Sequence, residues 1–262
     1  MKYLAVIILF IALIPSKAAD SLASVELKAY NASHGKIALA AKFEIKKDWH
    51  IYWKNPGDAG MPTTIDWTLP EGFSVMDTRY GYPIRFATEG ITSFGYKDSA
   101  FVIYYIEYPQ DISGSFQIKG KAKWLACKEK CLPGSEYVAI EIPFKNGIFN
   151  GAYLPERINS QLPEKGDFIS GTAGRYGGDV SVMIDGITGK PLDFFPLQEG
   201  VFDISKKPEF KERSGRIEFS MGRPQYPLAR ADRVEGLLIV KENDRHIPYY
   251  INFPIIKKEH QR

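Results

Sequence analysis

The chain has 262 residues, of which 44% are hydrophobic and 25% are charged, the composition of a folded globular protein rather than a disordered one. Its formal net charge is only +3, which excludes the strongly basic surface of a nucleic-acid-binding protein. Aromatic residues make up 13%, alongside 23 glycines and 17 prolines. This mixture favours short β-strands separated by many turns.

Residues 1–19 have the features of a secretory signal peptide. Lys2 provides the basic start, and the apolar stretch from Tyr3 to Ile14 is too short to span a membrane comfortably. Ser16-Lys17-Ala18 matches a small-x-small cleavage site, although an uncleaved membrane anchor is the alternative. No later stretch is long and apolar enough to span a membrane. The mature chain is therefore expected in the periplasm, where disulfides persist.

Alternating apolar and polar residues predict strands throughout the first half of the chain. The expected strands are 25–29, 37–45, 49–53, 65–69, 100–108, 116–124 and 138–144. Residues 79–98 are irregular and aromatic, which indicates either a loop that covers a site or ordinary packing between strands. His50 lies in an aromatic strand, so it is either a packed histidine or a ligand and acid–base group.

The only two cysteines, Cys127 and Cys131, lie four positions apart. In a straight strand their Cα atoms would be about 13 Å apart, too far for a disulfide. A bond therefore requires a turn at Lys128-Glu129-Lys130, and Pro133-Gly134 is expected to end the element just after it. Closing so short a loop removes only about 2 kcal/mol of unfolded-chain entropy, which makes the pair a poor staple.

Three interpretations of the cysteine pair remain open at this point. Two thiols either side of a tight turn suit thiol–disulfide exchange, in which one attacks and the other resolves the mixed disulfide. Two soft sulfurs also suit Cu(I), and the site could be completed by His50, His34, Met61 or Met76. An inert structural disulfide is the third interpretation. A hydrolase is disfavoured, because the chain has no G-x-S-x-G motif and only four histidines.

The second half repeats the β pattern after a break that is rich in glycine and proline. The predicted organisation is an all-β chain of two β-sandwiches in tandem, without independent chemistry in the second. Its parts are a signal peptide (1–19), a first sandwich that carries the cysteines (20–146), a linker (147–166) and a second sandwich (167–262).

Three segments, Trp49–Pro62, Ile65–Gly72 and Trp124–Gly134, resemble the periplasmic N-terminal region of the DsbD/ScsB family of transmembrane reductases. The likeness is strongest over 45–145 and weaker in the second half. The three residues between the cysteines are closer to the ScsB-like branch, because DsbD itself has a longer spacing.

The resemblance implies an immunoglobulin-like sandwich whose Cys127/Cys131 pair shuttles electrons, a component of a protein-disulfide reductase that needs no cofactor besides its disulfide. The expected donor is a thioredoxin-like domain or a DsbD/ScsB-type membrane reductase, supplied by a separate protein, and the acceptors are periplasmic disulfide-bonded proteins. By analogy, Cys131 forms the mixed disulfide and Cys127 resolves it. The expected cap or partner-contact residues are Phe86, Phe94, Tyr96 and Trp124.

Overall fold

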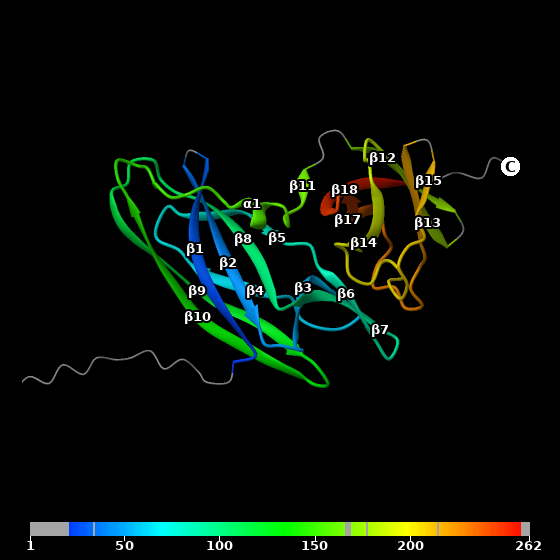
Figure 1. The fold of residues 1–262 in the computed structure, drawn as a ribbon, viewed down its shortest axis with the longest axis horizontal. Helices are drawn as coiled ribbons and strands as arrows, with labels where there is room; N and C mark the ends of the chain where they lie inside the picture. The colour runs from blue at the N-terminus through cyan, green and yellow to red at the C-terminus, as the bar shows by residue number, and fades with distance from the viewer. Residues whose placement is uncertain (1–20, 34, 166–168, 177, 214, 258–262) are drawn as a thin grey trace, which may run out of the picture.

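The structure is a computed structural model in which almost every element is a β-strand (Figure 1). None of the helices in the described part of the chain is long and apolar enough to cross a membrane. The predicted signal peptide and His34 lie outside the described residues. The structure describes residues 21–33, 35–165, 169–176, 178–213 and 215–257.

The first domain is a sandwich of two antiparallel sheets. One sheet has the strand order β1-β2-β8-β5, and the other has the order β10-β9-β3-β7-β6 with β4 added beside β9. Phe43 of β2 and Trp124 of β9 meet edge to face between the sheets, with ring centroids 6.1 Å apart. The strands are β1 (Ala23–Ser33), β2 (Lys36–Ile45), β3 (His50–Gly57), β4 (Thr64–Thr68), β5 (Ser74–Tyr80), β6 (Ile84–Thr88), β7 (Ile91–Lys97), β8 (Ser99–Glu107), β9 (Gly114–Cys127) and β10 (Cys131–Phe144).

The predicted linker is packed against the first domain along part of its length. It contains the single-turn helix α1 (Glu156–Asn159), and Ile158 and Leu162 are both buried against β2 and β8 residues such as Ala38 and Phe101. The backbone amide of Asn31 also donates to Ala152 O at 2.8 Å. The segment between the domains is therefore anchored, so it restricts how the domains can move.

The second domain is built from one continuous sheet with the order β14-β17-β18-β12-β13-β16-β15 and β11 beside β18. The rings of Phe194 (β14) and Phe219 (β16) lie 5.1 Å apart although their strands are far apart in this order. The two ends of the sheet therefore face each other across buried side chains, as in a sandwich. Its strands are β11 (Glu164–Lys165), β12 (Ser170–Tyr176), β13 (Asp179–Asp185), β14 (Lys190–Pro196), β15 (Lys211–Arg213), β16 (Arg216–Met221), β17 (Arg233–Glu242) and β18 (Arg245–Lys257).

The two domains share one hydrophobic core. Phe195 of the second domain packs edge to face against both Trp53 and Phe94 of the first, with centroids 6.3 and 5.1 Å away. The buried side chain of Asn55 donates to Pro196 O at 2.7 Å across the junction. The prediction of an all-β, immunoglobulin-like fold is confirmed, and the sheets form two joined domains.

Two local expectations can be compared with the structure. Of the two alternatives for residues 79–98, packing between strands is the one observed, because they form the end of β5 and the hairpin of β6 and β7. Pro133 and Gly134 do not end the element after the cysteines, because β10 continues through both. Pro133 is tolerated there because β10 is the edge strand of its sheet, where a missing backbone N–H leaves no ladder partner unpaired.

Candidate functional site

The cysteine pair closes the hairpin of β9 and β10. Cys127 and Cys131 are directly opposed in the strand register and form a disulfide with their Cα atoms 4.1 Å apart. Residues 128–130 make the turn, in which Lys128 N donates to Lys130 O at 3.2 Å. Cys127 is only 2% exposed, whereas Cys131 is exposed. Of the two cysteines, only Cys131 is therefore accessible to a partner.

The hairpin is supported from the core side by Trp124. A side chain at Gly134, the strand partner of Trp124, would overlap the indole ring. Trp124 itself is 2% exposed and packs on Phe43. This predicted cap or contact residue thus lies in the core, beneath the hairpin that carries the disulfide, rather than on the surface.

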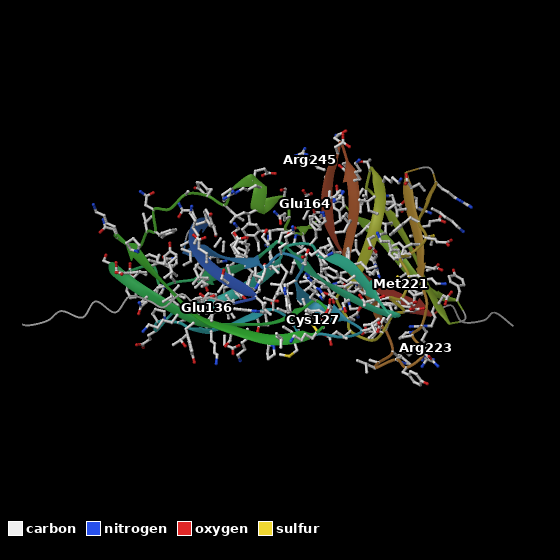
Figure 2. All side chains as sticks on the ribbon, turned by 60° about the horizontal axis from the view of Figure 1, so that its bottom comes forward. Cys127, Glu136, Glu164, Met221, Arg223 and Arg245 are labelled. Atoms are coloured by element: carbon white, nitrogen blue, oxygen red, sulfur yellow. A yellow bond between two sulfur atoms is a disulfide. The ribbon has the colours of Figure 1, made fainter. Side chains whose placement is uncertain are left out.

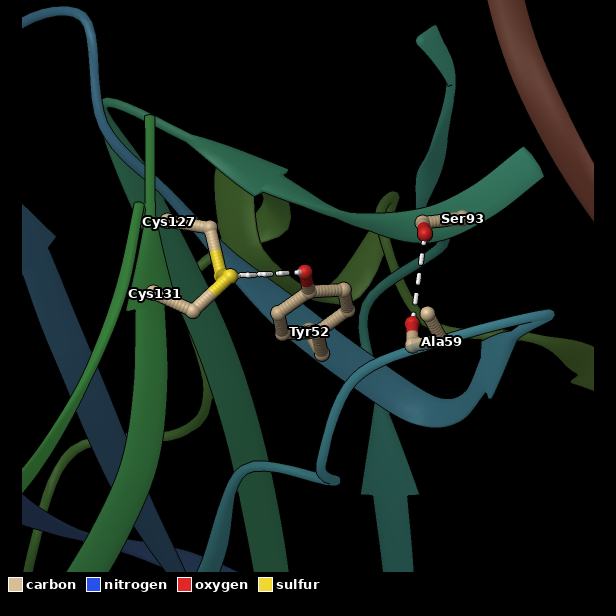
Figure 3. The surroundings of a disulfide bond; sticks show 5 residues. All are labelled: Tyr52, Ala59, Ser93, Cys127 and Cys131. Atoms are coloured by element: carbon tan, nitrogen blue, oxygen red, sulfur yellow. Dashed lines mark hydrogen bonds between the residues drawn. A yellow bond between two sulfur atoms is a disulfide. The ribbon is translucent and has the colours of Figure 1, made fainter. Parts of the chain in front are cut away.

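Tyr52 is the side chain in direct contact with the disulfide (Figure 3). Its hydroxyl donates to Cys127 Sγ at 3.0 Å and lies 3.8 Å from Cys131 Sγ. Burial raises the pKa of Tyr52 above its ordinary value of 10.0, and the Ser93 hydroxyl partly opposes this. Tyr52 is therefore protonated at neutral pH and acts as a donor to sulfur.

The loop after β3 holds the Tyr52 ring in place. Gly60 has a φ of +125°, and any side chain there would overlap the ring of Tyr52. Ser93 Oγ donates to Ala59 O at 3.2 Å, which fastens the same loop to β7 (Figure 3). The glycine is needed because the loop passes directly against the aromatic ring.

His50 lies beside Cys127 on the same face of the sheet. The two residues are opposed in the register of β3 and β9, so their side chains point the same way. The imidazole stacks on Phe86 with centroids 4.4 Å apart and meets Tyr52 edge to face at 5.3 Å. Burial, and secondarily the charge of Lys97, lowers the pKa of His50 below 6.5. The imidazole is therefore neutral at pH 7.

Of the three predicted cap residues in 79–98, the structure brings only Phe86 to this group. Phe94 is fully buried and packs between Trp53 and Phe195 at the domain junction. Tyr96 is also buried, and its hydroxyl donates to Gly81 O at 2.7 Å. Strand alternation explains the difference, because Phe94 and Tyr96 lie on the face of β7 opposite to Ser93.

The charges of the turn are solvent-exposed. Lys128 forms an ion pair with Asp48 at 3.7 Å, and Glu129 and Lys130 are exposed. Within the described residues no three His, Cys, Asp or Glu side chains are grouped as a metal site would require. The expected copper ligands Cys127, Cys131 and His50 lie on one face but do not form such a group, and the two sulfurs are bonded to each other.

Sequence reasoning missed Tyr52, Ser93 and Gly60. The signal for Tyr52 was present, because it follows His50 by two positions and so shares its face. Nothing in the alternation indicated that the loop after β3 would return to that face and hold the ring.

Comparison with known proteins agrees with the family resemblance seen in the sequence. Residues 18–141 match the family described as "Thiol:disulfide interchange protein DsbD, N-terminal". No curated protein matches the chain significantly. The crystal structure of the N-terminal periplasmic domain of ScsB from Proteus mirabilis superposes with a TM-score of 0.59 and 14% identity, covering 90% of this chain and 94% of that one. The two-domain fold is thus shared almost end to end.

A second solved structure is similar over a shorter part. The N-terminal domain of DsbD from Neisseria meningitidis, in its reduced form, aligns with 46% of this chain and 86% of that one, at 11% identity and a TM-score of 0.31. The chain thus contains a DsbD/ScsB N-terminal-like domain, and the match to the DsbD family model extends over residues 18–141.

Proposed function

We propose that the protein is a periplasmic carrier of reducing equivalents and that Cys127–Cys131 is its redox-active disulfide. The observation that carries this proposal is the asymmetry of the pair. Cys131 is exposed at the start of an edge strand, while Cys127 is buried and receives a hydrogen bond from Tyr52. Exchange requires one sulfur that a partner can reach and one that leaves readily.

The exchange begins with reduction of the carrier by a partner dithiol. The partner thiolate attacks Cys131 Sγ, the bond between Cys131 and Cys127 breaks, and Cys127 leaves as a thiolate with the electron pair. The partner's second thiol then attacks the mixed disulfide and releases Cys131. The partner ends as a disulfide, and the carrier ends as a dithiol after uptake of the two protons.

Delivery to a substrate reverses these roles. The Cys131 thiolate attacks a substrate disulfide, and Cys127 resolves the resulting mixed disulfide, which restores the carrier's disulfide and leaves the substrate with two thiols. Tyr52 favours the step in which Cys127 departs, because its hydroxyl already points at that sulfur and a hydrogen bond to a charged acceptor is stronger than one to a neutral acceptor.

The partners follow from the same proposal. The donor is a thioredoxin-like domain or a membrane reductase of the DsbD/ScsB type, and the acceptors are disulfide-bonded periplasmic proteins. The family match over residues 18–141 supports this choice.

The test is a pair of measurements on the purified protein. Equilibration against glutathione buffers should give a reduction potential between about −120 and −270 mV, the range of exchanging pairs, whereas structural disulfides lie below about −300 mV. With an oxidised thioredoxin-like protein, the Cys131 thiolate of Cys127→Ser should attack the partner's disulfide and form a mixed disulfide as the partner's other sulfur leaves as a thiol, whereas Cys131→Ser should not. A potential below the structural limit, or trapping by Cys131→Ser alone, would overturn the proposal.

A Cu(I)-binding protein is the second candidate, favoured by the position of His50 beside Cys127. In the reduced protein the two thiolates and the neutral imidazole would supply soft ligands that suit Cu(I). This alternative predicts one Cu(I) per chain, held against a chelator and lost in Cys127→Ser, Cys131→Ser and His50→Gln alike. Weak copper retention by the reduced wild type would exclude it.

A further inference from the structure

A small pocket in the second domain, which we call the arginine pocket, is lined by three arginines. Arg175 comes from β12, and Arg223 and Arg230 come from the loop of residues 222–232 between β16 and β17. The volume of the pocket is about 270 Å³. The rest of its lining is small and uncharged: Gly178, Val201, Ala229 and Ala231. Within the described part of the chain, three positive charges thus surround a space that no carboxylate lines.

The three guanidinium groups of the arginine pocket differ from two other arginines, which have acidic partners. Arg85 forms a buried ion pair with Asp193 across the domain junction, at 2.9 Å. Arg216 forms an exposed ion pair with Asp185, at 2.8 Å. Among the described residues, no carboxylate forms an ion pair with any of the three pocket arginines. Like charges that share a site repel each other, so an anion that enters the pocket is attracted by all three.

Two carboxylates lie near the arginine pocket but outside it. Asp179 and Asp203 flank Gly222 at the start of the loop, where a side chain would lie 3.7 and 3.9 Å from their oxygens. Neither of them lines the pocket. Asp203 Oδ1 already accepts a hydrogen bond from Ser205 N at 2.9 Å. These two carboxylates lower the net charge of the surroundings, but they do not neutralise the guanidinium groups at contact distance.

Arg175 is oriented before any ligand binds. It is half-buried, and its Nη2 donates to Ala231 O at 2.9 Å. A guanidinium has five N–H donors in a fixed plane, so this bond fixes the plane and leaves other donors for a ligand. Arg223 and Arg230 are exposed, so their donors are accessible from solvent.

The loop of residues 222–232 is fastened to the domain along its length. Backbone hydrogen bonds of 2.9, 2.9 and 2.8 Å hold its start, middle and end, from Asp203 N to Gly222 O, from Leu228 N to Gly200 O and from Ile255 N to Asp232 O. Pro224 and Pro227 restrict its backbone further, because the proline ring fixes φ. The arginines of this loop therefore lose less conformational entropy on binding than they would on a free loop.

We propose that the arginine pocket binds a phosphate group. A phosphate monoester carries about two negative charges and three terminal oxygens at neutral pH, and the planar fork of arginine matches such oxygens two at a time. The volume of the pocket lies below the roughly 300–1,000 Å³ of sites for drug-sized ligands, so it suits the phosphate group rather than a whole large molecule. The proposal does not depend on the redox function of the first domain, and Figure 2 shows Arg223 well apart from Cys127.

Soluble phosphates and the headgroups of membrane phospholipids share this chemistry. Tyr226 and Leu228 lie between Arg223 and Arg230 in the loop, and they are 81% and 77% exposed. A soluble phosphate does not need these apolar side chains, whereas a membrane surface would bury them beside the bound headgroup. The two side chains therefore distinguish the two sources of the phosphate.

Isothermal titration calorimetry of the purified protein with inorganic phosphate tests the site. The wild type should bind one phosphate per chain, and Arg175→Gln and Arg230→Gln should each weaken binding at least about tenfold, because each removes charge-assisted hydrogen bonds. Arg245→Gln is the matched control, because it removes the same charge from an exposed position elsewhere in the second domain (Figure 2), and the affinity should not change. A wild type that does not bind phosphate, or equal weakening in Arg245→Gln, would overturn the proposal.

Two further variants keep this test independent of folding and of the redox site. Arg175→Gln also loses the bond to Ala231 O, whereas Arg230 is exposed, so Arg230→Gln decides the outcome if Arg175→Gln folds poorly. Cys127→Ser should bind phosphate as tightly as the wild type. Failure of thiol–disulfide exchange would therefore leave the phosphate site standing, and absence of phosphate binding would leave the exchange function standing.

Vesicles of phosphatidylglycerol and phosphatidylcholine identify the source of the phosphate. If it is a lipid headgroup, the wild type should sediment with the vesicles, and Tyr226→Ser/Leu228→Ser should stay in solution while its affinity for inorganic phosphate is unchanged. If it is soluble, the wild type should bind inorganic phosphate and not the vesicles. Either result supports the phosphate site. Vesicle binding that is unaffected by Arg230→Gln would count against it, because the membrane contact would then not use the arginine pocket.

Discussion

The two faces of the β10-β9-β3-β7-β6 sheet differ in what they do, although the same strands build both. On one face lie the half-buried His50 and the buried Cys127 and Tyr52, next to the exposed turn that ends in Cys131. On the other, Ile51 and Trp53 are buried in the core shared with the second domain. Cys127 lies about midway along the long axis of the molecule (Figure 2).

Successive side chains of a β-strand point to opposite faces of the sheet. The comparison shows how this alternation can place chemistry on one face and core packing on the other. Consecutive residues such as Phe86 and Arg85 serve opposite faces, so each face can be altered with little direct contact with the other. Variants on the buried face should therefore change the free energy of unfolding. Variants on the disulfide face should instead change the reduction potential.

The largest effect is expected at the buried ion pair. Asp193→Ala leaves the guanidinium of Arg85 buried without its carboxylate and removes the acceptor for Phe194 N. Loss of one partner of a buried pair costs about 3–5 kcal/mol. Urea unfolding followed by tryptophan fluorescence should show this decrease.

The exposed pair of Arg216 and Asp185 is the control for this prediction. Asp185→Ala should leave the unfolding midpoint unchanged, because both side chains are solvated and their attraction is screened. Equal midpoints for Asp193→Ala and Asp185→Ala would mean that the domain junction contributes no more than a surface contact.

The second effect tests the buried face beneath the disulfide. Gly134→Ala would place a methyl group in the space of the Trp124 ring, and such overpacking costs about 1–3 kcal/mol. The potential of Cys127–Cys131 should stay within experimental error, because Trp124 lies on the opposite face. Gly178→Ala is the control, since no atom lies within 4 Å of the added group. A large change in potential would contradict the separation of the faces.

Strand alternation predicted much of the first domain, and the reason lies in its burial. Strands such as 116–124 have one face in the core, so buried residues recur at every second position. Strand β5 and the β6–β7 hairpin were missed because they lack this contrast: β5 is exposed or half-buried throughout, and β7 is buried on both faces. Propensity alone cannot place such strands.

The cysteine pair and its turn were predicted from local sequence, because residues 127–131 act within one hairpin. Tyr52 and Arg85 were not, since their partners are distant in the chain. The hydrogen bond from Tyr52 spans 75 positions and the ion pair from Arg85 spans 108. Their roles depend on which strands become neighbours, and that information is absent from any single segment.

A smaller effect is expected from the disulfide face itself. Tyr52→Phe removes the donor to Cys127 Sγ while keeping the ring against Gly60. A thiolate gains more from this hydrogen bond than a disulfide sulfur does, so its loss disfavours the reduced state. The potential should become more negative by about 30 mV, which corresponds to about 1.4 kcal/mol for two electrons. Glutathione equilibration measures this shift, and an unchanged potential would remove Tyr52 from the mechanism.

The smallest effect concerns protonation of His50. Its pKa is lowered in the folded protein by burial and by Lys97, relative to the value of 6.5 expected in the unfolded chain. Below pH 6.5 the unfolded chain therefore binds more protons at this site, and stability decreases as the pH falls through the folded pKa. Unfolding curves from pH 8 to pH 5 should show this loss in the wild type and a weaker loss in His50→Gln. Identical pH profiles would mean that the imidazole, although stacked on Phe86, titrates as freely as in the unfolded chain.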